Sequence, residues 1–160
     1  FYLMANIEAS NFSGENNWAL LLDPDGFIAE GTGDNFFIIK DNTIKTPEGR
    51  NILRGISRDY IINTISNQLD IPVIETNIEP YDVYNADEAF MTGTPFCMLP
   101  VTSLNKIEIG DGKVGPIFTT LINQWSGNIN VDIVSQIKKW NIIDGDDTSE
   151  SPTPYRFNKK

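Results

Sequence analysis

The chain has 160 residues, 40% apolar and 21% charged, which is enough for one packed domain with a short tail. Its formal charge of −10 comes from 22 acidic and 12 basic side chains, and no basic run is longer than two residues, so nucleic acid and anionic membranes are poor partners. It has no histidine and a single cysteine, Cys97, which excludes histidine-based catalysis by this chain alone, an internal disulfide and a thiolate metal cluster.

The chain opens with one predicted helix and one predicted β-hairpin. Residues 2–9 are rich in helix formers, and Ser13-Gly14 supplies a stop. The apolar segments 18–22 and 27–29 flank Asp-Pro-Asp-Gly at 23–26, where proline presets the turn and glycine accepts positive φ. This pattern predicts a hairpin.

A second hairpin and a helix follow. Segments 36–39 and 43–46 predict two strands around the polar turn at 41–42. The spacing then changes to three and four residues, which predicts a helix with one apolar stripe formed by Tyr60, Ile61, Ile62, Ile65 and Leu69. Ser57 occupies the natural N-cap position of this helix, with Asp59 in its first turn.

The rest of the chain is predicted to alternate short strands and helices. Composition and breaks indicate a strand at 72–78, a short helix at 80–84, strands at 88–91 and 98–104, and helices at 117–125 and 131–140. From 144 to 160 the chain has too little apolar content to order itself. We therefore expect an α+β domain over residues 1–143 and a polar tail over 144–160.

Three glycine-centred breaks lie between the predicted elements. Their sequences are Glu-Gly-Thr-Gly-Asp-Asn at 30–35, Gly-Ile-Ser-Arg at 55–58 and Thr-Gly-Thr-Pro at 92–95. A glycine before a helix lets backbone N–H groups approach an anion, so Gly55-Ile56-Ser57 is a candidate phosphate seat. Taken singly, each break is also explained as an ordinary turn, with Ser57 as a helix cap. Gly31 and Gly33 do not form a dinucleotide loop, because a third glycine and a following helix are missing.

Taken together and in order, the breaks carry a resemblance. The segments "LLLDPDGFIAEGTGDNFF", "ILRGISRDYII", "ADEAFMTGTPFCMLPV" and "GDGKVGPIFTTLI" resemble the large C-terminal domain of class IV, fold type IV, pyridoxal-phosphate aminotransferases. This group includes the branched-chain and D-amino acid aminotransferases and aminodeoxychorismate lyase. The resemblance runs from about residue 3 to residue 140, and it implies a strand-rich sheet with helices packed on it.

The resemblance implies roles for particular residues. Glu30 matches the acidic residue that pairs with the pyridine nitrogen of pyridoxal 5'-phosphate, where a carboxylate keeps the ring protonated and therefore an electron sink. Ile56 and Ser57 match donors to the cofactor phosphate, and Thr94 matches a second hydroxyl contact. Arg58 matches an arginine that either lies near the cofactor or braces the loop.

The same resemblance places the Schiff-base lysine a few residues before Phe1, so no catalytic residue is expected within this chain. Lys40 and Lys45 match no catalytic position. The small N-terminal domain, with its phosphate-binding arginine, is also not represented. We therefore expect these 160 residues to be inactive alone.

Gly93, Thr94 and Pro95 match the loop that binds the substrate carboxylate. Proline has no N–H to donate, so at Pro95 one hydrogen bond to a charged group is lost, a difference of about 1.5–3 kcal/mol. Either the carboxylate binds differently, or the substrate is not a standard α-amino acid, or the neighbouring N–H groups suffice.

As a whole, the resemblance implies a homodimer that exchanges an amino group between an amino acid, with branched-chain amino acids as one candidate, and a 2-oxo acid. The lone Cys97 suits a reducing compartment, so a cytoplasmic location is expected. No metal, nucleic acid or membrane partner is expected. Two alternatives are a lyase of the aminodeoxychorismate type and a non-catalytic module that kept the fold.

Overall fold

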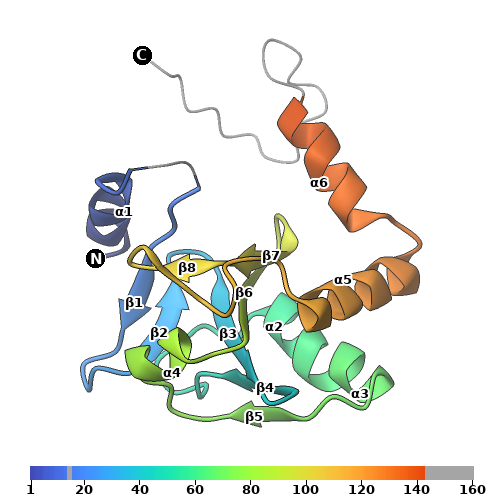
Figure 1. The fold of residues 1–160 in the computed structure, drawn as a ribbon, viewed down its shortest axis with the longest axis horizontal. Helices are drawn as coiled ribbons and strands as arrows, with labels where there is room; N and C mark the ends of the chain where they lie inside the picture. The colour runs from blue at the N-terminus through green and yellow to red at the C-terminus, as the bar shows by residue number, and fades with distance from the viewer. Residues whose placement is uncertain (14–15, 143–160) are drawn as a thin grey trace.

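The computed structural model describes residues 1–13 and 16–142. A seven-stranded sheet forms the centre of this part of the chain, in the order β1-β2-β3-β4-β5, with β6 paired to both β3 and β7 (Figure 1). The strands are β1 Leu20–Leu22, β2 Ile28–Gly31, β3 Asn35–Lys40, β4 Thr43–Thr46, β5 Val73–Glu75, β6 Glu88–Gly93, β7 Cys97–Val101, and the separate pair β8 Ser103–Leu104 and β9 Ile107–Glu108. The helices are α1 Tyr2–Ser10, α2 Ile56–Tyr60, η1 Ile61–Ile65, α3 Ser66–Gln68, α4 Pro80–Tyr84, α5 Pro116–Ile129 and α6 Ile133–Ile142.

Strand β3 lies at the middle of the sheet and is buried on both faces. Phe37 and Ile39 belong to the core on the helix-covered face, whereas Phe36 and Ile38 belong to the core on the opposite face. The alternation follows from the two-residue period of a strand. An unbroken apolar run is therefore what this position requires.

The helix-covered face of the sheet is packed against α2, η1, α3 and α5 (Figure 1). The first three of these run on without a break, because the residues that join them, Ile61 and Ser66, have right-handed helical dihedrals. This helical segment connects β4 to β5, which pair in parallel. The start of this segment, at Gly55 and Ile56, lies at the end of the sheet where the functional residues gather.

A buried carboxylate joins the sheet to α5. Glu88 accepts hydrogen bonds from the backbone N–H groups of Ile117 and Phe118, at 2.9 and 2.8 Å. These are first-turn N–H groups that have no partner inside the helix. A side chain at Gly115 would overlap the Glu88 carboxyl group, so the glycine makes room for the cap.

Most of the predicted elements are confirmed, among them the first helix, both hairpins, the short helix at 80–84 and the two final helices. The predicted N-cap at Ser57 is wrong: the helix begins at Ile56, its N-cap is the extended residue Gly55, and no side chain caps it. The final helix starts at Ile133 rather than 131, because Asn130 adopts a left-handed conformation and Asp132 accepts hydrogen bonds from the N–H and hydroxyl of Ser135.

Two predicted strands were too long. The strand at 72–78 is confined to β5, and the strand at 98–104 is divided into β7 and β8. Gly14 and the tail at 144–160 lie outside the described residues. Among the described residues, no helix combines the length and apolar character needed to cross a membrane.

Candidate functional site

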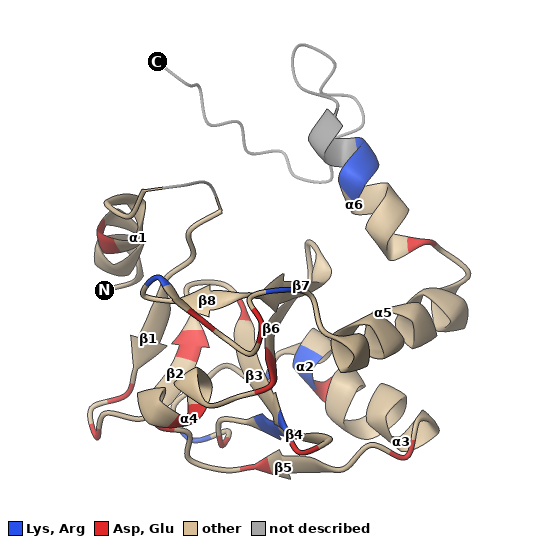
Figure 2. Cartoon of the chain, in the orientation of Figure 1, with Lys and Arg blue, Asp and Glu red and all other residues tan. Residues whose placement is uncertain are grey.

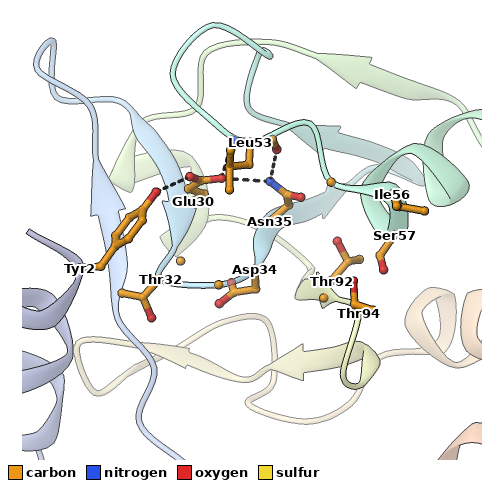
Figure 3. Close-up of a pocket in the computed structure, with 14 residues that line it drawn as sticks. Tyr2, Glu30, Thr32, Asp34, Asn35, Leu53, Ile56, Ser57, Thr92 and Thr94 are labelled. Carbon is orange, nitrogen blue, oxygen red and sulfur yellow. Dashed lines mark hydrogen bonds between the residues drawn. The ribbon is translucent and has the colours of Figure 1, made fainter. Parts of the chain in front are cut away.

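A pocket of about 200 Å³ opens at one end of the sheet, where β2 turns into β3 (Figure 3). The loop that enters α2 and the end of β6 complete it. Its lining consists of Tyr2, Glu30, Gly31, Thr32, Gly33, Asp34, Asn35, Leu53, Gly55, Ile56, Ser57, Thr92, Gly93 and Thr94. The three glycine-centred breaks of the sequence therefore meet in one place.

Glu30 is the buried acid of this pocket, and it is the acidic segment of β2 in Figure 2. Its Oε1 accepts a hydrogen bond from the Tyr2 hydroxyl at 2.8 Å, and its Oε2 accepts from the Leu53 N–H at 2.8 Å and the Asn35 amide at 3.2 Å. Three donors compensate the carboxylate for the water lost on burial. A carboxylate has about four acceptor positions, so one position, on Oε1, is left for a ligand.

Asn35 holds the two sides of the pocket together. Its amide donates to Glu30 and also to the Leu53 carbonyl at 2.8 Å, which ties β3 to the loop before α2. Its side-chain oxygen occupies the space that a Cβ on Gly55 would need. Glycine at the N-cap is therefore required by this close approach, and Glu30 and the start of α2 are positioned by the same side chain.

The opposite side of the pocket is rich in hydroxyl groups. Figure 3 shows Glu30 with Tyr2 on one side, and Ser57 with Thr94 on the other. Ser57 is buried in the first turn of α2, where N–H groups and the helix dipole favour an anion. Thr92 is buried at the end of β6, and its hydroxyl has no hydrogen-bond partner among the described residues.

Asp34 is a second acid in the lining. Burial raises the pKa of this carboxyl to about 6, and the negative charge of Glu30 acts in the same direction, whereas the Gly33 N–H opposes the rise. The Tyr2 pKa is also raised, first by its hydrogen bond to Glu30 and then by burial. The phenol therefore stays protonated and donates to the carboxylate.

The structure brings most of the predicted site residues together. Glu30, Ile56, Ser57, Gly93 and Thr94 line the pocket. Two predicted residues are not in the lining, Arg58 and Pro95. The sequence resemblance left two roles open for Arg58, and its geometry supports the bracing one: the guanidinium donates to the Pro47 carbonyl at 2.9 Å and to the Glu75 carboxylate at 2.5 Å.

Sequence reasoning missed Tyr2, Asp34, Asn35 and Thr92 as individual contributors. The last three lie inside the glycine-centred breaks, so the signal was their neighbourhood. Tyr2 comes from α1, 28 positions before its partner Glu30, and no local pattern indicates that contact.

The pocket has two chemically different sides. One presents the carboxylates of Glu30 and Asp34, and the other presents hydroxyls and a helix start. None of the lining residues is a lysine or an arginine. Such a pocket suits a small ligand with a protonated nitrogen that donates at one end and an anionic group that accepts at the other, and pyridoxal phosphate has both groups. The Thr92 hydroxyl, which has no hydrogen-bond partner among the described residues, belongs to the same lining.

Fold and pocket together thus define a small-molecule-binding α+β domain. The family described as "Amino-transferase class IV" matches residues 1–104, and the chain belongs to this family. A "Branched-chain-amino-acid aminotransferase" of Pseudomonas aeruginosa is 43% identical over 105 residues, which are 66% of this chain and 34% of the relative. A "Probable branched-chain-amino-acid aminotransferase" of Aquifex aeolicus is 37% identical over 123 residues, 76% of this chain and 39% of the relative.

Solved structures of branched-chain amino acid aminotransferases are also similar to this chain. The branched-chain amino acid aminotransferase of Escherichia coli superimposes with a TM-score of 0.73 and 34% identity, over 79% of this chain and 42% of that one. The branched-chain amino acid aminotransferase of Thermobaculum terrenum in its PLP-form superimposes with a TM-score of 0.71 and 31% sequence identity, over 79% of this chain and 41% of that one. The predicted α+β, fold type IV architecture is confirmed. The chain spans between a third and two fifths of the length of the curated relatives it matches.

Proposed function

We propose that this chain forms the pyridoxal-phosphate-binding part of an aminotransferase that moves an amino group between a branched-chain amino acid and a 2-oxo acid. The observation that carries the proposal is the buried Glu30 carboxylate facing a hydroxyl-rich helix start across one pocket. The relatives named as branched-chain aminotransferases support the substrate class.

Pyridoxal phosphate, when bound, supplies a protonated ring that takes up the electron pair left at the substrate α-carbon. The role of Glu30 is to hold the ring proton. Its remaining acceptor position on Oε1 can receive one N–H, while Tyr2, Leu53 and Asn35 keep the carboxylate fixed. Because those donors are already in place, the charge needs no reorganisation during the reaction.

The phosphate is held at the other side. The Ile56 and Ser57 backbone N–H groups and the Ser57 hydroxyl lie in the first turn of α2, and Thr94 follows β6. Ile56 is 85% exposed, so it contributes through its backbone rather than through its side chain. Arg58, in the first turn after the Gly55 N-cap, stabilises this loop through Pro47 and Glu75 instead of contacting the ligand.

The substrate carboxylate is assigned to Gly93, Thr94 and the loop that follows. Pro95 has no N–H, so carboxylate recognition in this loop depends on the N–H of Thr94 and of Phe96. The Phe96 N–H bonds the Gly93 carbonyl at 3.3 Å, a long contact that a stronger acceptor can replace.

Proton transfer at the substrate α-carbon needs a base, and no lysine lines this pocket in the described residues. The proposal therefore includes that residues 1–160 do not turn over substrate by themselves. It also includes a homodimer. Light scattering of the protein at its natural length tests the dimer.

The single cysteine supports a cytoplasmic location.

The decisive experiment substitutes Glu30 in the protein at its natural length. Glu30→Gln keeps the shape and removes the charge, so we expect kcat for transamination of leucine with 2-oxoglutarate to fall roughly a hundredfold or more while KM changes little. Glu48→Gln, at an exposed position, is the matched control. The absorbance of bound pyridoxal phosphate reports loading. A wild-type protein that does not bind the cofactor, or a Glu30→Gln protein with full activity, contradicts the proposal.

A further inference from the structure

Thr92 and Asp34 are the residues of the pocket lining that have a buried polar side-chain atom without a hydrogen-bond partner among the described residues. Thr92 lies at the end of β6, between β3 and β7, where its Cα partners are Asn35 and Met98. It is 1% exposed, and its hydroxyl has no hydrogen-bond partner among the described residues. A buried hydroxyl without a partner destabilises a protein, so its presence calls for a physical reason.

The direction of the side chain follows from the strand period. Thr92 lies two residues after Phe90, so the two side chains are on the same face of β6. Phe90 belongs to the core that packs against the helical segment beginning at Ile56. Thr92 is therefore on the face that carries the start of α2, and Figure 3 shows it among Ser57, Asn35 and Thr94.

We propose that the Thr92 hydroxyl donates a hydrogen bond to the anionic group of the ligand, as a further phosphate-binding residue beside Ser57 and Thr94. This inference rests on the proposed function and extends it. The three hydroxyls come from different positions, the first turn of α2, the end of β6 and the turn after it, so they approach one ligand group from different sides. A hydroxyl can donate without any change in ionisation, which suits a phosphate ester.

The chain contains a matched comparison for this residue. Thr46 on β4 is also fully buried, but its hydroxyl donates to the Phe36 carbonyl at 2.9 Å. Replacing either threonine by valine removes a hydroxyl and keeps the shape. At position 46 the change breaks a hydrogen bond of the ligand-free fold, whereas at position 92 it replaces an unpartnered group by a methyl group.

The experiment measures stability and affinity separately in the protein at its natural length. For Thr92→Val we expect an unchanged or higher urea midpoint without ligand, and an affinity for pyridoxal phosphate lower by roughly ten- to a hundredfold. The affinity for pyridoxal, which lacks the phosphate, stays within about twofold. Thr92→Ser keeps the wild-type affinity for pyridoxal phosphate. Thr46→Val lowers the urea midpoint and leaves the affinity unchanged.

Two results would overturn the inference while leaving the proposed function in place. One is a Thr92→Val protein that binds pyridoxal phosphate as tightly as the wild type. The other is a loss of affinity of equal size for pyridoxal and for pyridoxal phosphate, which would assign the effect to general packing. A wild-type protein that binds neither compound would overturn the proposed function itself, and the inference with it.

Discussion

Asp34 gives a stability prediction whose size and pH range follow from its surroundings. Its carboxyl lies so close to the Gly31 backbone that a Cβ there would overlap both carboxyl oxygens, and Oδ2 has no hydrogen-bond partner in the described part of the chain. The charged form is therefore poorly solvated, and the nearby Glu30 charge adds repulsion. We expect Asp34→Asn, which cannot ionise, to stabilise the protein at neutral pH.

The size of the expected change in unfolding free energy follows from the linkage between proton binding and folding. Burial raises the Asp34 pKa from 3.8 to about 6. At about 1.36 kcal/mol per pH unit this difference amounts to about 3 kcal/mol, and partial exposure of the side chain reduces it to about 1–2 kcal/mol. Because the folded-state pKa is the higher one, the favourable contribution of protonated Asp34 is fully present below pH 3.8 and is lost as the pH rises through about 6.

Urea denaturation followed by circular dichroism at pH values between about 4 and 8 tests this. We expect the Asp34→Asn and wild-type curves to converge near pH 4 and to separate by about 1–2 kcal/mol above about pH 7, with the change between about pH 4 and 6. Asp25→Asn, at a side chain 65% exposed on the hairpin turn, serves as the control. A difference between Asp34→Asn and wild type that is independent of pH would refute the reasoning.

Two other substitutions test the supports of the site. Glu88→Gln removes the negative charge that accepts hydrogen bonds from the first turn of α5. We expect the free energy of unfolding to fall by about 1.5–3 kcal/mol and the cofactor affinity to stay unchanged. A variant as stable as the wild type would show that this cap does not stabilise the protein. Asn35→Asp replaces the amide that donates to Glu30 at 3.2 Å by a second carboxylate. We expect the free energy of unfolding to fall by about 1–3 kcal/mol and the cofactor affinity to fall as well. An unchanged affinity would show that Asn35 does not support cofactor binding.

The local elements were predictable because their signals are local. The Asp-Pro-Asp-Gly turn at 23–26 and the run of four apolar residues at 36–39 determine a hairpin and a buried strand almost without reference to the rest of the chain. The parallel pairing of β4 with β5 was not predicted, because it depends on the helical segment between them returning the chain to the same edge.

The site was predictable as a set of motifs and not as a network. The glycine-centred breaks were predicted as places where backbone could approach a ligand, and the structure brings all three to one pocket. The Tyr2 hydrogen bond to Glu30 and the Asn35 bonds that position the carboxylate join residues whose contact only the tertiary fold creates. The side-chain direction of Arg58 was likewise open until its partners Pro47 and Glu75 were known.

The pairing of β3 with β6 explains why chemistry is concentrated where it is. On the helix-covered face of this pair, Phe37 lies opposite Phe90 with the rings stacked at 4.7 Å. Glu88 lies two residues before Phe90 on β6 and caps α5. Asn35 and Thr92 pair at the other end, two residues from the stacked rings, and face the start of α2. The stacked rings form the dry centre, and the polar residues at both ends meet helix N-termini. Glu88 accepts hydrogen bonds from the first N–H groups of α5, whereas the Thr92 hydroxyl has no partner among the described residues. The end of the pair at Thr92 therefore retains a hydrogen-bonding group for a ligand, at a cost in stability.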